Sequence, residues 1–257
     1  LLSPSCVERA QHPQSSSLHC VVLVCQIPHP MTTFAEELRR VHEEVRISIG
    51  DEAFGALKRW VSEMVRDRVG ADAMREGDMF PFDVVLPDAS GAMCSLDQLL
   101  AEGPIVLVFY RGSWCPFCNL HLVGFEMLDA EFRRAGAQLV AVSPQTIDTS
   151  LETVQLGNLG YSVLSDLGNV LSRQLGLVFK APENIKDVYR SIGIDFEAHN
   201  GDCSWEIPIS ATYVIHSSHR VVFSHVDVDY TNRVDPSEVL EVVKQQQELQ
   251  KLDPGTP

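Results

Sequence analysis

A Cys-x-x-Cys motif lies between a buried strand and an amphipathic helix, and it restricts the fold more than any other feature of the sequence. Residues 105–108 (IVLV) form a continuous apolar run, which is typical of a strand buried on both faces. Cys115 and Cys118 follow, and apolar residues then recur every three or four positions from Leu120 to Ala130, which predicts a helix. A Cys-x-x-Cys motif in this context indicates redox chemistry.

The start of the predicted helix favours a thiolate. The first amide groups of a helix have no partner within it, and the helix dipole is positive at this end, so the pKa of a thiol placed there falls. Pro116 suits the first helical turn, where its missing N–H is not needed. Arg111 could add positive charge at the same place, and Trp114 borders the motif. The thiolate is the form that attacks a disulfide or a peroxide.

Composition restricts the class of partner and the compartment. The 257 residues are 45% hydrophobic, which is enough for a substantial core, and the net charge of −15 argues against a nucleic acid or an anionic membrane as partner. No apolar run is long enough to cross a bilayer. The seven cysteines are odd in number and irregularly spaced apart from the 115/118 pair, so we expect a reducing compartment, the cytoplasm, and no secreted disulfide framework.

The residues before the motif divide into two parts. Residues 1–30 are rich in Ser, Pro and His, and we interpret them as a disordered or non-native tail. Residues 31–75 begin with a capping box, Thr33 and Glu36, and carry two apolar stripes separated at Gly50. They predict a helical hairpin packed on the following domain, and a dimerisation arm, which would make the chain a homodimer, is the open alternative.

Residues 76–250 are predicted to form one α/β domain. Strand patterns, each followed by a helix, alternate from about residue 82 to 191, and they are followed by a β-hairpin (212–215 and 220–226) and a helix that begins near Asp235. This order predicts a central mixed β-sheet flanked by helices on both faces.

The domain resembles the thioredoxin fold, and within it the alkyl hydroperoxide reductase / thiol-specific antioxidant branch, the peroxiredoxins. The resemblance rests on FYRGSWCPFCNLHL, on EGDMFPFDVVLPDASG before it and on ATYVIHSSHRVVFSHVDVDYTNRVDPSEV near the end, and it covers about residues 76–245. It implies a thiol-dependent peroxidase that takes a hydroperoxide as substrate and thioredoxin or a similar thiol donor as reductant.

The family pattern is only partly present. In the family motif Pro-x-x-x-Thr-x-x-Cys, the Cys attacks the peroxide, and the resemblance puts this role on Cys118. The Thr position falls on Cys115, the Pro position on Arg111, and a distant peroxide-binding Arg falls near Ser210. The resemblance therefore implies Cys118 as the attacking thiol and Cys115 as the thiol that resolves it, with Arg111, Trp114, Pro116 and Ser210 in support.

Other interpretations of the motif stay open. A disulfide oxidoreductase without peroxidase activity would use Cys115 as an exposed attacking thiol, and a redox-inactive binding module would use neither cysteine. A zinc site needs four ligands, and Cys203 with His199 is poorly spaced for one, so we expect neither a metal nor a cofactor. Cys203 could instead be a distant resolving thiol. His121 is expected to be a partly exposed helix residue rather than a proton donor.

Overall fold

A five-stranded mixed sheet forms the centre of the structure, a computed structural model that describes residues 32–252. The tail expected at residues 1–30 lies outside the described residues. The strands, in their order across the sheet, are β5 (Ser162–Ser165), β4 (Gln138–Ser143), β3 (Ile105–Phe109), β8 (Ser210–Ile215) and β9 (Val221–Asp227). Strands β3, β4 and β5 are parallel, whereas β8 and β9 run antiparallel to their neighbours, which confirms the predicted mixed sheet.

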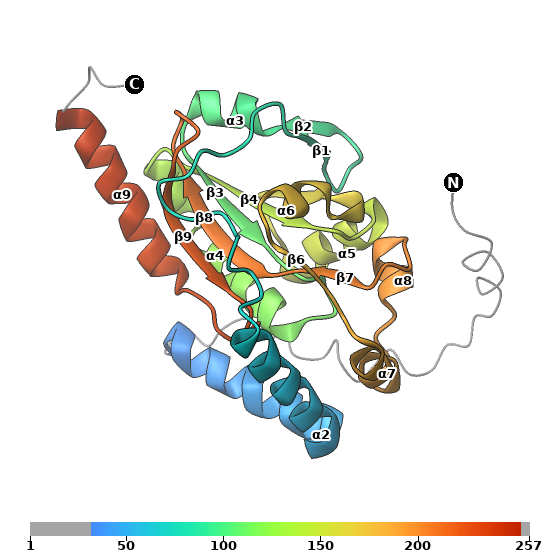
Figure 1. The fold of residues 1–257 in the computed structure, drawn as a ribbon. Coiled ribbons are helices and arrows are strands. Elements are labelled where there is room, and N and C mark those ends of the chain that lie inside the picture. The colour runs from blue at the N-terminus through green and yellow to red at the C-terminus, as the bar shows by residue number, and fades with distance from the viewer. Residues whose placement is uncertain (1–31, 253–257) are drawn as a thin grey trace.

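Strand β3 is buried along its whole length because it lies between β4 and β8 with helices over both faces (Figure 1). Val106 and Val108 join the core under α4 (Pro116–Arg134) and α9 (Pro236–Leu252), and Ile105, Leu107 and Phe109 join the core under α3 (Leu96–Glu102) and α6 (Val170–Gln174). A strand alternates its side chains between the two faces of a sheet, so a continuous apolar run fills both cores.

Short elements complete the domain. They are β1 (Val85–Pro87) paired with β2 (Met93–Ser95), α5 (Ile147–Gly157), the 3-10 turn η2 (Leu167–Asn169), α7 (Glu183–Ser191), α8 (Phe196–Asn200), and β6 (Val178–Lys180) paired with β7 (Glu206–Pro208). The first strand starts at Val85 rather than at residue 82, because Asp83 has a φ of +60°, which extended backbone does not allow. No helix among residues 32–252 is long and apolar enough to cross a membrane.

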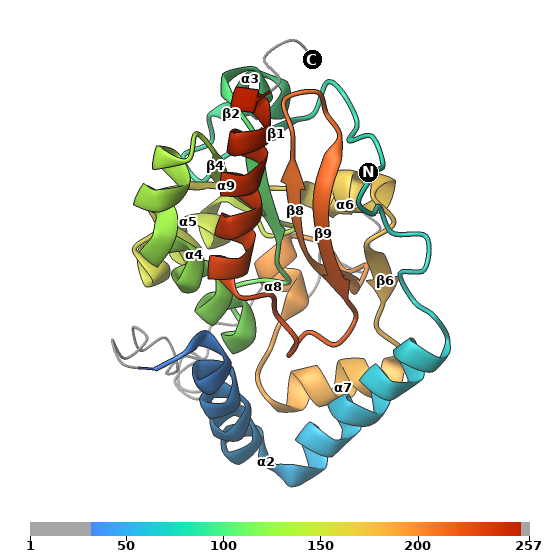
Figure 2. The same ribbon diagram turned by 90° about the vertical axis from the view of Figure 1, so that its left-hand side faces the viewer.

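The predicted N-terminal helical region is present as α2 (Phe34–Arg66), which bends at Gly50. Thr33 and Glu36 form the expected capping box, and Gly50 takes a φ of +81°, which favours glycine. The two arms meet near the bend, where the rings of His42 and Phe54 lie 4.9 Å apart, and then diverge (Figure 2). Helix α2 packs against α4 and α7, which places it beside the Cys-x-x-Cys motif.

Candidate active site

The two cysteines lie at the junction that the sequence predicts. Strand β3 ends at Phe109, and α4 begins at Pro116, with Cys115 as the residue before its first turn. Pro116 occupies the first helical turn, as expected, where no carbonyl group of the helix requires its missing N–H. Cys118 therefore lies in the first turn of α4, where unpaired amides and the helix dipole favour negative charge.

The sulfur of Cys118 is surrounded by donors and positive charge. Its side chain is 1% exposed. The backbone N–H of Arg111 donates to Sγ at 3.5 Å, and Nη2 of Arg233 lies 3.3 Å from the same atom. Burial alone would raise the pKa of Cys118, but the hydrogen bond from Cys115 and the charges of Arg233 and Arg111 outweigh burial and lower this pKa to about 5. Cys118 is therefore ionised at neutral pH.

Cys115 has the opposite character. It is 2% exposed, and both cysteines are free thiols in this structure. Burial, followed by the hydrogen bond and the charge of Cys118, raises the pKa of Cys115 well above its usual value. Cys115 thus stays protonated and donates its S–H to the Cys118 thiolate. These properties disfavour the exposed, attacking Cys115 that the disulfide-oxidoreductase interpretation requires.

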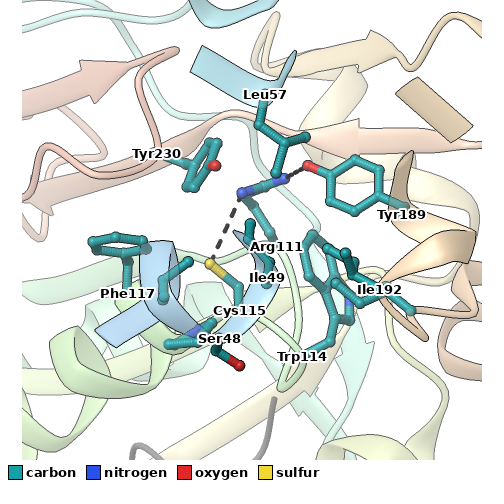
Figure 3. Close-up of a pocket in the computed structure, with 13 residues that line it drawn as sticks. Ser48, Ile49, Leu57, Arg111, Trp114, Cys115, Phe117, Tyr189, Ile192 and Tyr230 are labelled. Atoms are coloured by element: carbon teal, nitrogen blue, oxygen red, sulfur yellow. Dashed lines mark hydrogen bonds between the residues drawn. The ribbon is translucent and has the colours of Figure 1, made fainter. Parts of the chain in front are cut away.

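Arg111 is a buried cation held by aromatic rings. Its guanidinium carbon lies 4.0 Å from the ring centre of Tyr230 and 4.6 Å from that of Trp114, and Nη2 donates to the hydroxyl of Tyr189 (Figure 3). Nη1 lies 3.9 Å from Sγ of Cys115. Within residues 32–252, no carboxylate forms an ion pair with Arg111, and its Nε has no hydrogen-bond partner. Its charge is therefore directed at the two sulfurs.

The backbone before the motif allows the contact between Arg111 and Trp114. Gly112 has a φ of +148°, and a Cβ at this position would lie 2.3 Å from Nε1 of Trp114. A side chain at residue 112 would therefore displace the indole ring from its position beside the guanidinium. The sequence segment Arg-Gly-Ser-Trp before the first cysteine thus has a steric explanation.

A pocket leads to Cys115 and Arg111 (Figure 3). Its walls are mainly apolar, and they come from α2, from the motif and from the segment around α7. The lining residues are Val45, Ser48, Ile49, Leu57, Arg111, Trp114, Cys115, Pro116, Phe117, Tyr189, Ile192, Ile194 and Tyr230. The helical extension therefore forms part of the site, a role that the sequence did not indicate.

The supporting role of Ser210 stays a prediction, whereas the expectation for His121 needs correction. Ser210 begins β8, and its buried hydroxyl has no hydrogen-bond partner among the described residues. The second cation at Cys118 comes from Arg233. His121 is 4% exposed, not partly exposed as expected, because the ring fits between those of Phe34 and Phe125. Arg233 lies far along the chain, in the last of the segments that carry the family resemblance, but no residue pattern there indicated a contact with Cys118.

Comparison with known proteins identifies the family. A model of the AhpC/TSA family matches residues 77–224, more than half of the chain. A putative peroxiredoxin of Mycobacterium tuberculosis is 31% identical over 104 residues, which are 40% of this chain and 67% of that protein. The putative peroxiredoxin bcp of Coxiella burnetii is 29% identical over 93 residues, 36% of this chain and 61% of that protein.

Solved structures show the same fold. The crystal structure of the peroxidoxin BcpB from Mycobacterium tuberculosis has a TM-score of 0.53 and 22% identity, over 67% of this chain and 97% of that one. A mutant of PrxQ from Xylella fastidiosa has a TM-score of 0.54 and 16% identity, over the same shares. The fold, the motif at the start of α4 and the family match lead to one conclusion: the chain belongs to the AhpC/TSA family of peroxiredoxins.

Proposed function

We propose that this peroxiredoxin-family chain reduces hydroperoxides with Cys118 as the attacking thiol and Cys115 as the resolving thiol. The family and its relatives make the chain a thiol-dependent peroxidase in class. The assignment of roles is supported chiefly by one observation, the position of Arg233 Nη2 at 3.3 Å from Cys118 Sγ. With Arg111, this contact stabilises the thiolate that the first step requires.

The proposed reaction has three steps. The Cys118 thiolate attacks the terminal oxygen of the hydroperoxide, the O–O bond breaks, and the alkoxide leaves and takes up a proton, which gives an alcohol and a sulfenic acid on Cys118. Cys115 then attacks the Cys118 sulfur, water leaves, and a disulfide forms. An external thiol donor finally reduces this disulfide by thiol–disulfide exchange and supplies the two electrons.

The two arginines would also act on the oxygen that leaves. Negative charge develops on this oxygen as the O–O bond breaks, and a cation held nearby in a buried site stabilises such charge without reorganising. Arg111 is suited to this role because its neighbours are aromatic rings and no carboxylate within the described residues neutralises it. It would thereby replace part of the donor set that this chain lacks at the positions of the family Thr and the distant Arg.

The pocket supports an organic hydroperoxide with an apolar body as substrate. The α2 side chains Val45, Ile49 and Leu57 give the entrance apolar walls, which hydrogen peroxide does not require. The bacterioferritin comigratory protein of Xanthomonas campestris, a structural neighbour of this chain, has alkyl peroxide reduction activity. We propose thioredoxin or a similar thiol donor of a reducing compartment, such as the cytoplasm, as reductant. We also propose that α2 can act as a dimerisation arm, which would make the protein a homodimer.

Two cysteine variants test the roles. With peroxide present, Cys115→Ser should accumulate a sulfenic acid on Cys118, which dimedone traps and mass spectrometry locates, and the variant should lose turnover because no thiol resolves it. Cys118→Ser should form no sulfenic acid, because Cys115 is protonated.

The opposite result would replace the proposal with the disulfide-oxidoreductase interpretation. That result is dimedone on Cys115 in Cys118→Ser together with unlabelled Cys118 in Cys115→Ser. Turnover of the wild-type protein, followed with thioredoxin, its reductase and NADPH, against a glutathione system as control, identifies the donor.

A further inference from the structure

His121 lies one helical turn after Cys118 on α4 and contacts the loop that carries Arg233. Its Nε2 lies 3.1 Å from the carbonyl oxygen of Val234. A carbonyl oxygen can only accept, so Nε2 carries the proton and donates it. Residues three apart on a helix face the same side, so the Cys118 thiol and the His121 ring both face the segment that follows β9.

The surroundings of His121 keep the imidazole neutral. The ring is 4% exposed and packs against Phe34 of α2 and Phe125 of α4. The charged and titratable groups that face it are Arg233 from the loop and His225 from β9. Burial, together with these two groups, holds the pKa of His121 well below its usual value. The imidazole therefore serves as a neutral hydrogen-bond donor at neutral pH.

The loop after β9 is tied to the end of that strand, and His121 connects it with α4. Asn232 Nδ2 donates to the carboxylate of Asp227, the last residue of β9, at 3.0 Å, and the hydroxyl of Thr231 donates to the carboxylate of Asp229 at 2.7 Å. Neither of these bonds reaches α4. The bond from His121 does, because it connects the residue next to Arg233 with the helix that carries the thiol.

We propose that His121 is a positioning residue, which holds the guanidinium of Arg233 against the Cys118 sulfur through its hydrogen bond to the Val234 carbonyl. Arg has a long, flexible side chain, and its 3.3 Å contact with Sγ requires its backbone to stay in place. The buried Val234 side chain also helps to dock the loop, so loss of the hydrogen bond should weaken the contact without abolishing it. The importance of this role for turnover rests on the proposed function.

The test measures the pKa of the Cys118 thiol rather than turnover. In the reduced full-length protein, the rate of Cys118 alkylation by iodoacetamide is followed against pH, and mass spectrometry assigns the label. His121→Leu should raise the pKa of Cys118 by about half a unit to one unit, and Arg233→Ala should raise it further, since a nearby opposite charge shifts a pKa by about one to three units. His121→Gln, which can place an amide N–H near the position of Nε2, should restore most of the wild-type value.

A double-mutant cycle separates positioning from general loosening of the core. With Arg233→Ala already present, His121→Leu should cause no further rise, because the charge that it positions is gone. Phe125→Leu, which alters a neighbour of His121 on the same helix but no hydrogen bond to the loop, is the matched control and should leave the pKa unchanged.

Three results would overturn the proposal. The pKa of Cys118 could be unchanged in His121→Leu, it could rise as much when His121→Leu is added to Arg233→Ala as when it is added to the wild type, or it could rise as much in Phe125→Leu as in His121→Leu. If His121→Leu does not fold, the comparison of His121→Gln with Arg233→Ala still decides. A Cys118 pKa that is raised as much in His121→Gln as in Arg233→Ala would contradict the positioning role. Failure of the wild-type protein to reduce peroxides would refute the proposed function and leave these pKa results standing.

Discussion

Removal of Arg233 should make the rate at which Cys118 reacts depend on pH in a range where the rate of the wild-type protein is constant. Unit charges 3.3 Å apart attract by about 5 kcal/mol at an effective dielectric constant of about 20, equivalent to more than about three pKa units and an upper limit here. Arg111 and the S–H of Cys115 remain in Arg233→Ala, so we expect a rise of about one to two units.

The size of the rate loss follows from that rise. The wild-type pKa is about 5, so the thiolate of Cys118 is almost fully formed from pH 6 upward. With a pKa raised by two units, the thiolate fraction falls about tenfold at pH 6 and by only about a tenth at pH 8. Loss of charge stabilisation for the leaving oxygen would add a decrease that is equal at both pH values, of up to about 10²- to 10³-fold.

Stopped-flow measurement of peroxide reduction under single-turnover conditions, at pH 6 and at pH 8, separates these two contributions. Arg233→Lys keeps the charge and should retain most of the wild-type rate, and Arg173→Ala, which removes an exposed arginine paired with Glu206, is the control. Equal rates for Arg233→Ala and the wild type at pH 6 would refute the assignment of Arg233 to the thiolate.

Three further changes test other parts of the site. The pKa of Cys118 is lower in the folded than in the unfolded chain, so ionisation of this thiol stabilises the folded state. This contribution to the free energy of unfolding is complete above about pH 8.5 and is lost as the pH falls through about 5. Chemical denaturation of the reduced protein should thus show a steeper loss of stability from pH 8 to 5 than in Cys118→Ser. Gly112→Ala should destabilise by about 1–3 kcal/mol more than Gly91→Ala, which shares the positive φ but has open space, as urea denaturation would show. Ile49→Gln should lower kcat/KM for cumene hydroperoxide by about tenfold or more and leave that for hydrogen peroxide unchanged, because one polar group replaces an apolar wall. Equal losses for both peroxides would contradict the role of α2 in selecting the substrate.

The sequence predicts the fold well because local signals agree with the tertiary contacts. The predicted hairpin strands, 212–215 and 220–226, have bounds within two residues of the observed β8 and β9, and the capping box at Thr33 and the bend at Gly50 are confirmed. The short strands β2, β6 and β7 were missed. Each has three residues, too few for a pattern of period two to stand out, and each depends on its partner for its extended form.

The candidate site is less predictable, because much of it comes from residues distant in the chain. The motif itself indicated Cys115, Cys118 and Arg111. Arg233 reaches the thiol across a separation of 115 residues, from a polar loop that follows an edge strand and lies beyond the segment that matches the family model. The aromatic residues Tyr189 and Tyr230, which hold Arg111, have equally ordinary local sequences, and only the packing of the loops onto α4 brings them together.

The contacts of Cys118 explain the departures from the family motif together. The resemblance places Cys115 where the family has Thr, and the S–H of Cys115 donates to the Cys118 thiolate as a hydroxyl there could. The same group can then resolve a sulfenic acid, which a Thr cannot do, because only sulfur forms the disulfide. The position of the family's distant Arg falls near Ser210, which carries no charge, and Arg233 brings positive charge to the thiol instead, while Arg111 occupies the position of the family Pro. On the proposed function, Cys115 thus takes the donor role of the family Thr and also serves as the resolving thiol, and Arg111 and Arg233 supply the positive charge of the missing distant Arg.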